Sequence, residues 1–169
     1  MCADGAQRFD AGDIHATIPA GYLTRDQVFM LRIVRDVLPH RPVYFTNSMY
    51  PKTLGLDRYL VTEGLAVRLL PSEPVESADM VRTTAGLVDV PRSLSLWRDT
   101  FRGRAAFVRQ DEWIDPASLV MPGQYVIAGS VLAEALEKRG SATESAAVAG
   151  EVQRMMGIAN LGSIFGRGD

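Results

Sequence analysis

The fold is decided by residues 24–71, which read TRDQVFMLRIVRDVLPHRPVYFTNSMYPKTLGLDRYLVTEGLAVRLLP. The first part of this stretch predicts an amphipathic helix. The hydroxyl of Thr24 can cap the helix start, while Gln27 can complete a capping box three residues later. Apolar residues then recur at helical spacing at Val28, Leu31, Val34 and Leu38. Pro39 ends the helix because it lacks a backbone N–H and its ring clashes with the preceding turn.

Two short apolar runs follow this helix, at residues 43–46 and 65–70. Both are rich in β-branched or aromatic residues and are bounded by turn-forming residues, so each predicts a strand. Residues 54–60 between them predict a short helix. A helical crossover favours parallel pairing of the strands it joins. We therefore expect an α/β fold in which residues 21–71 form a small helix-strand-helix-strand layered unit.

The segments on either side of this unit carry weaker signals. Residues 1–20 predict a loose lead-in, although Ile14, Ala16 and Ile18 alternate as in a short strand. Residues 72–88 contain Pro74 and several acidic residues and predict a surface connector.

Residues 89–160 predict a helical region. Asp89 can cap a helix with Pro91 in its first turn, and a long helix is expected from Pro122 until Gly140. A last helix is expected over residues 143–159. These two helices should form an αα-hairpin resembling one tetratricopeptide unit, with Ala146, Ala147 and Ala149 permitting close approach. Residues 161–169 predict a flexible tail.

Charge and composition limit the classes of function. The 169 residues include 18 basic and 20 acidic side chains, and both signs are scattered along the chain. This balance argues against nucleic acid as a partner. The longest unbroken apolar runs are only a few residues, so no transmembrane segment is expected in this chain. The first residues lack the pattern of a secretory signal, which predicts a cytoplasmic location if the chain is expressed as written.

No sequence motif predicts catalysis. His15 and His40 are the only histidines, and neither stands at metal-ligand or triad spacing. Cys2 is the single cysteine and has no partner for an internal disulfide. Nucleophile-elbow and phosphate-loop motifs are absent from the sequence. We therefore predict no catalytic residue, no metal and no cofactor for this chain.

An acidic cluster around a tryptophan allows two interpretations. Asp111, Glu112 and Asp115 surround Trp113, and two carboxylates beside an aromatic platform could contact a carbohydrate. Alternatively, Asp115 before a proline begins a turn or helix, and Trp113 anchors neighbouring elements. The structural interpretation is favoured, and the carbohydrate interpretation stays open.

Four charged residues in the decisive stretch are not explained by apolar packing. They are Arg41, Asp57, Glu63 and Arg68. We expect them to form buried or half-buried ion pairs that fix the two strands, and we prefer this role to ligand binding.

The same stretch resembles a known family. The motifs that carry the resemblance are Tyr22-Leu23-Thr24, Arg-Pro-Val-Tyr-Phe at 41–45, Leu-Gly-Leu-Asp-x-Tyr-Leu at 54–60, Glu-Gly-Leu-Ala-x-Arg-Leu at 63–69, Leu-Trp-Arg-Asp at 96–99 and Leu-Ala-Glu-Ala-Leu-Glu at 132–137. In this order they resemble the region after the membrane body of bacterial polytopic proteins of domain-of-unknown-function family 2723. Those proteins are similar to protein O-mannosyltransferases of the membrane glycosyltransferase-C class. The resemblance covers about residues 20–155.

The resemblance implies a function for the chain. In that family a multi-helix membrane body comes first and is where glycosyl transfer from a lipid-linked sugar is expected, so no catalytic residue is carried over. The chain is then a non-catalytic accessory or interaction domain, a fragment of such a protein on the periplasmic, extracytoplasmic face. Its expected partners are the missing membrane body, a partner subunit or a polypeptide acceptor, met through an exposed apolar patch.

Two other functions remain as alternatives. The first is a free-standing small carbohydrate-binding protein or enzyme that uses the cluster around Trp113. The second is a helical-repeat scaffold that binds a peptide or protein on the 122–159 hairpin.

Overall fold

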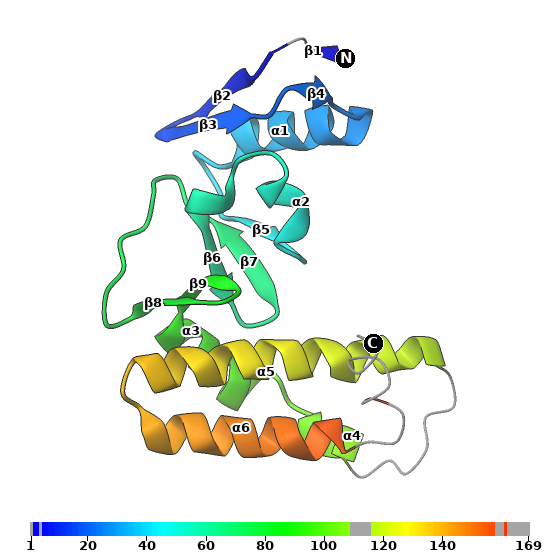
Figure 1. Ribbon diagram of the computed structural model, residues 1–169, viewed down its shortest axis with the longest axis vertical. Coiled ribbons are helices and arrows are strands. Elements are labelled where there is room, and N and C mark those ends of the chain that lie inside the picture. The colour runs from blue at the N-terminus through cyan, green and yellow to red at the C-terminus, as the bar shows by residue number, and fades with distance from the viewer. Residues whose placement is uncertain (1, 4, 109–115, 158–160, 162–169) are drawn as a thin grey trace. The chain divides into compact units, whose positions relative to one another are not determined.

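The computed structural model describes residues 2–3, 5–108, 116–157 and 161. It is a mixed α/β fold, as the sequence predicts, and it divides into two compact units (Figure 1). Unit 1 comprises Met1–Thr62 and Ala66–Glu76, and unit 2 comprises Glu63–Leu65 and Ser77–Asp169.

Unit 1 is built from short strands and one longer helix. Its elements in chain order are β1 (Cys2–Ala3), β2 (Gln7–Ala11), β3 (Ile14–Ile18), β4 (Gly21–Tyr22), α1 (Arg25–Val37), β5 (Val43–Phe45), α2 (Met49–Lys52), the 3₁₀ turn η1 (Asp57–Tyr59), β6 (Leu60–Glu63) and β7 (Ala66–Leu69). β1 pairs with β4, β2 with β3 and β5 with β7, all antiparallel. β6 is the other neighbour of β7.

Helix α1 begins and ends as the sequence predicts. The Thr24 hydroxyl accepts a hydrogen bond from the Gln27 N–H at 3.3 Å, and the Gln27 side chain accepts one from the Thr24 N–H at 2.9 Å. This capping box satisfies two backbone donors that a helix start leaves unpaired. Leu31 and Val34 are buried, and α1 contacts strand β2 (Figure 1).

The prediction of a loose lead-in for residues 1–20 is wrong. Strands β2 and β3, of five residues each, form an antiparallel hairpin whose inward side chains belong to the core of unit 1. Ile14, Ala16 and Ile18 are buried, because alternate residues of a strand point to the same face and this face of β3 is turned toward the core. Gly55 fixes the close approach to this hairpin: it has φ +72°, and a Cβ there would lie 2.3 Å from the Thr17 carbonyl oxygen.

The strand pairing also differs from the prediction. The short helix predicted for residues 54–60 is a single 3₁₀ turn, η1, and it is followed by β6, a strand that the sequence did not predict. The chain enters β7 from β6 through a tight turn at Gly64, which has φ +64°, and the helical segments α2 and η1 lie between β5 and β6 instead. β5 therefore pairs with β7 antiparallel, and the parallel pairing is wrong.

Unit 2 places two strands before its helices. Its elements are β8 (Met80–Thr83), β9 (Gly86–Asp89), α3 (Val90–Ser95), the π-helical turn η2 (Leu96–Thr100), α4 (Arg104–Val108), the 3₁₀ turn η3 (Pro116–Leu119), α5 (Val120–Lys138) and α6 (Ala142–Met156). β8 and β9 form an antiparallel hairpin where a connector was predicted. The predicted cap is confirmed, since the Asp89 carboxylate accepts a hydrogen bond from the Arg92 N–H at 2.9 Å.

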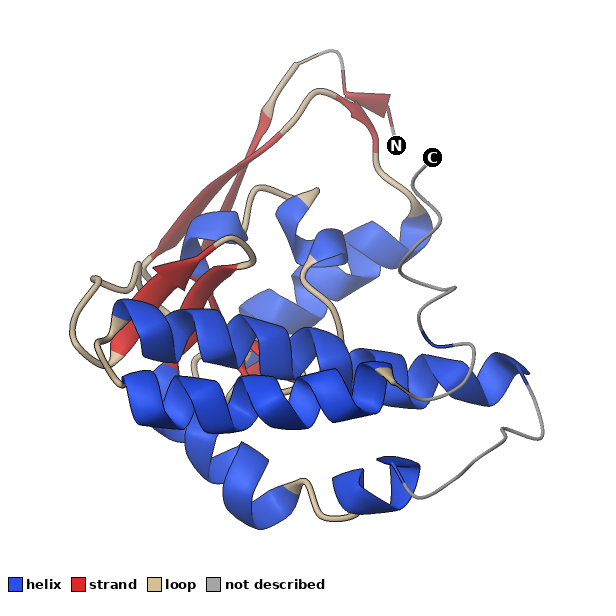
Figure 2. Ribbon diagram, turned by 60° about the horizontal axis from the view of Figure 1, so that its bottom comes forward, coloured by secondary structure: helices blue, strands red, loops and turns tan. Residues whose placement is uncertain are grey.

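The predicted αα-hairpin is confirmed, as α5 and α6 lie side by side (Figure 2). Of the three alanines predicted to allow this packing, Ala146 and Ala147 are exposed and only Ala149 is half-buried. The close approach is made by Gly129 of α5, where a Cβ would lie 2.5 Å from Val152 Cγ2 and 2.6 Å from Trp97 Cη2. The absence of a side chain at Gly129 lets both neighbours reach the α5 backbone.

Residues 117–138 are long and apolar enough to cross a bilayer by length and composition. Within the most apolar window 44 % of the residues are buried inside the protein. Val126, Leu132 and Leu136 of this helix belong to the core of unit 2.

Replacing Gly129 with alanine tests the close approach. The new Cβ would overlap Val152 and Trp97, so we expect the free energy of unfolding to fall by about 1–3 kcal/mol. Gly150→Ala in α6 is the matched control: the nearest atom to its Cβ is Arg154 Nη1 at 3.7 Å. This control should gain up to about 1 kcal/mol from helix propensity. Denaturant unfolding of both variants measures the difference, and equal stability would contradict the packing assignment.

Glu134 of α5 connects the helix to the β8–β9 turn. Lys138 Nζ lies 2.9 Å from Glu134 Oε1, and the Thr84 N–H and hydroxyl donate to the two carboxylate oxygens at 3.0 and 2.8 Å. These hydrogen bonds, chiefly the one from Lys138, lower the pKa of Glu134 below its ordinary value of 4.5, against the opposite effect of burial. A lowered folded-state pKa contributes stability above the unfolded-state pKa, and this stability is lost as the pH falls through the folded value.

Glu134→Gln should therefore reduce the free energy of unfolding at pH 7 by about 1 kcal/mol. The difference from the unsubstituted protein should shrink as the pH falls below 4.5, where Glu134 itself becomes protonated. Thermal unfolding across this pH range measures the stability difference between the variant and the unsubstituted protein. Glu137→Gln, at an exposed position of the same helix, is the control that should show no such trend. A pH-independent difference would contradict the assignment.

Candidate functional site

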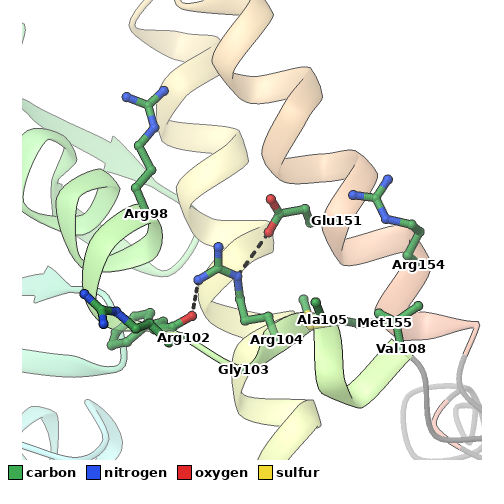
Figure 3. Close-up of a pocket in the computed structure, with 10 residues that line it drawn as sticks. Arg98, Arg102, Gly103, Arg104, Ala105, Val108, Glu151, Arg154 and Met155 are labelled. Carbon is green, nitrogen blue, oxygen red and sulfur yellow. Dashed lines mark hydrogen bonds and ion pairs between the residues drawn. The ribbon is translucent and has the colours of Figure 1, made fainter.

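A cavity of about 480 Å³ in unit 2 is the candidate site. It lies where α4 approaches α6, and arginines from residues 98–104 and from α6 surround it (Figure 3). Its charged lining residues are Arg98, Arg102, Arg104, Glu151 and Arg154. Its apolar wall includes Phe101, Val108 and Met155.

Two irregular backbone features position these side chains. Residues 96–100 form a π-helical turn, closed by a hydrogen bond of 2.9 Å from the Phe101 N–H to the Leu96 carbonyl oxygen. Such turns insert one extra residue into a helix and often occur at functional sites. Gly103 then adopts φ +95°, which reverses the chain into α4 and brings Arg104 toward α6.

Arg104 is the fixed cation of this cavity. Its side chain is only 15 % exposed, and its Nε lies 3.0 Å from Glu151 Oε2. Its Nη1 donates to the carbonyl oxygens of Trp97 and Phe101, and its guanidinium lies 4.3 Å from the centre of a Trp97 ring. Ion pair, hydrogen bonds and cation–π contact together hold the guanidinium in one position.

The other arginines are held less tightly. Arg98 pairs with Glu144 of α6 at 2.7 Å, and Arg102 Nε donates to the Asp99 carbonyl oxygen at 3.1 Å. Arg154 of α6 is exposed, and its guanidinium makes no hydrogen bond or ion pair within the part of the chain that the structure describes. Counted over the described residues, the cavity therefore has an excess of positive charge and several guanidinium donors without a hydrogen-bond acceptor.

A second hollow lies on α1 in unit 1. It has a volume of about 320 Å³ and is lined by Leu23, Arg25, Val28, Phe29 and Arg32. Phe29 is 66 % exposed, and Ile33, one turn further on the same side of the helix, is 42 % exposed. We call Arg25, Phe29, Arg32 and Ile33 the α1 outer face.

The four charged residues that the sequence singled out lie in different surroundings. Arg41 and Asp57 are exposed, and Arg68 is half-buried in β7 opposite Tyr44. Glu63 is buried, with a side chain 5 % exposed, and its Oε2 lies 3.9 Å from Arg92 Nε. Ion pairing among the four stays a prediction. The pairing with Arg92 was missed because it joins residues far apart in sequence.

The remaining predicted positions lie either outside the described residues or at the surface. Asp111, Glu112, Trp113 and Asp115 lie outside the described residues, so the carbohydrate interpretation stays a prediction. His15 Nδ1 lies 2.6 Å from Asp10 Oδ1 on the exposed side of the β2–β3 hairpin. Hydrogen bonds from His15 and Arg8 lower the pKa of Asp10. Among the described residues, no three His, Cys, Asp or Glu side chains are grouped to hold a metal.

The arginines of the cavity were missed by sequence reasoning. Three of them fall within residues 98–104, and this local cluster is the only signal that the sequence offers. Glu151 and Arg154 come from a helix almost fifty residues later, and only the tertiary structure brings them to the same cavity.

A comparison with known protein families identifies the first half of the chain. The family model described as TMEM260-associated domain 2 matches residues 3–89 of the 169. This match runs from β1 to β9, and it ends before the helices that form the arginine cavity. No curated protein and no solved structure matches the chain.

Glu63→Gln tests the buried ion pair. The substitution removes the charge that faces Arg92, so we expect the free energy of unfolding to fall by about 1 kcal/mol, less than for a fully buried pair because Arg92 is half exposed. Glu73→Gln is the control, since the Arg58–Glu73 pair is 3.8 Å long and both side chains are exposed. It should cost less than about 0.5 kcal/mol. Thermal unfolding separates the two, and an unchanged Glu63→Gln protein would reject a stabilising role.

Proposed function

The chain belongs to the TMEM260-associated domain 2 family, and from this membership we propose that it is an accessory interaction domain of a TMEM260-like membrane protein. In this proposal the domain performs no catalysis. Glycosyl transfer, the activity expected of an O-mannosyltransferase-like protein, belongs to the membrane body. The domain lies on the extracytoplasmic face and contacts that body, a partner subunit or a polypeptide acceptor.

The observation that carries the proposal is the α1 outer face, which lies inside the segment that the family model matches. Phe29 and Ile33 expose apolar surface on a helix whose opposite side is buried in the core. Arg25 and Arg32 stand beside them. An exposed aromatic residue with neighbouring arginines is typical of the centre of a protein–protein interface.

The polar groups of the matched segment have structural roles that favour binding over catalysis. The Tyr59 hydroxyl accepts a hydrogen bond from the His15 N–H at 3.0 Å and so ties η1 to the β2–β3 hairpin. Glu63 is paired with Arg92, and Asp10 with His15 on an exposed strand. Each of these contacts fixes the backbone or pairs a charge within the fold, whereas a catalytic group must face a bound substrate.

Photo-crosslinking in cells tests the proposed partner. p-Benzoylphenylalanine at position 29 should give an adduct that mass spectrometry identifies as the TMEM260-like membrane protein. The same amino acid at position 75 is the control, because Val75 is 82 % exposed but lies in the loop after β7. Equal adducts from both positions would reject the α1 outer face as the interface, and adducts from position 29 that lack the membrane protein would reject that protein as the partner.

A binding measurement completes this test. Phe29→Asp should weaken co-purification with the membrane protein about tenfold or more, corresponding to about 1.4 kcal/mol of binding free energy. Its thermal stability should be unchanged, since the side chain is exposed. The purified chain should show no glycosyl transfer from lipid-linked sugars, and turnover would contradict the non-catalytic role.

A further inference from the structure

We propose that the arginine-lined cavity of unit 2 binds an oxyanion, a phosphate or a carboxylate, that is attached to an apolar group. The cavity lies outside residues 3–89, so this binding site is independent of the family match and of the proposed interface on α1.

Among the described residues, the lining of the cavity carries more positive than negative charge, which favours a bound anion. Four arginines and one glutamate line it, and the glutamate is already paired with Arg104. Glu144, outside the lining, pairs with Arg98. The charges of Arg102 and Arg154 are then left without a carboxylate in the described residues. Like charges gathered in one hollow repel each other, and a bound anion would relieve this repulsion.

The geometry suits an oxyanion. A guanidinium offers donors in a planar fork that matches the oxygens of phosphate or carboxylate. Among the described residues only the Nε of Arg102 is used in a hydrogen bond, so there its terminal N–H groups stay available. Arg104 does not need the ligand to fix it, because Glu151 and two carbonyl oxygens already do. It provides a preorganised positive centre, while Arg102 and Arg154 can close on the anion.

The apolar wall favours a ligand larger than a free ion. Phe101 packs edge-on against Tyr125, with ring centroids 5.7 Å apart, so its position is fixed. Met155 is buried beneath the cavity, and Val108 is partly exposed at its edge. A volume of about 480 Å³ is within the range of small-molecule sites, which combine apolar walls with a few polar groups.

A solvated arginine surface is the competing explanation. Exposed arginines alone would fit it, but Arg104 is largely buried and pairs across to α6. The π-helical turn and the positive φ of Gly103 are further departures from regular structure that bring these groups together. A binding site needs cations that are held in fixed positions by the fold, whereas a solvated surface does not.

Titration with phenyl phosphate and with inorganic phosphate tests the proposal. Nitrogen-15 NMR of the full chain should show saturable shifts of the Nε–H signals of Arg102 and Arg104 and of the Gly103 amide. Phenyl phosphate should bind at least tenfold more tightly than inorganic phosphate because it also fills the apolar wall. Equal affinity would overturn the apolar part of the proposal, and the absence of saturable shifts at the cavity would overturn all of it.

Matched variants separate the site from general charge effects. Arg102→Gln combined with Arg154→Gln should weaken phenyl phosphate binding at least tenfold. Arg35→Gln combined with Arg41→Gln removes the same charge from exposed positions of unit 1 and should leave the affinity unchanged at constant ionic strength. Equal loss in both double variants would overturn the proposal. Arg104 is left intact because its contacts support the fold, and crosslinking at position 29 should be unaffected in either case.

Discussion

The structure depends on how helix α1 divides its apolar residues between two sides. The capping box at Thr24 fixes where the helix begins, and so fixes which residues face the core. Leu31, Val34 and Leu38 are buried in unit 1, whereas Phe29 and Ile33 stay exposed. Burying an aromatic side chain stabilises by about 1.5–3 kcal/mol, so an exposed Phe29 leaves that free energy to be gained by binding. A surface of this kind is what the proposed accessory role requires.

Local signals in the sequence were sufficient for the elements that local chemistry determines. The caps at Thr24 and Asp89 are made by residues three positions apart, and the structure has both. The alternation of Ile14, Ala16 and Ile18 is likewise a local signal, and it corresponds to strand β3. The antiparallel pairing of β5 and β7 could not be predicted, because it follows from the turn at Gly64 and not from the strands themselves.

The candidate site was harder to predict than the fold for the same reason. Arg98, Arg102 and Arg104 are close in sequence, but Glu151 and Arg154 reach the cavity only because α5 and α6 form a hairpin. That hairpin packs closely through Gly129, whose missing side chain admits both Trp97 and Val152. Trp97 in turn supports the guanidinium of Arg104. Core packing and the cavity are therefore coupled through one tryptophan.

The central claim is that α1 presents a binding surface to a TMEM260-like membrane protein. Hydrogen exchange of the chain, alone and with that protein purified in detergent, tests it most directly. The account predicts added protection centred on residues 25–37, with little change in α5 and α6. Unchanged exchange in α1, or protection confined to the α5–α6 hairpin, would contradict it.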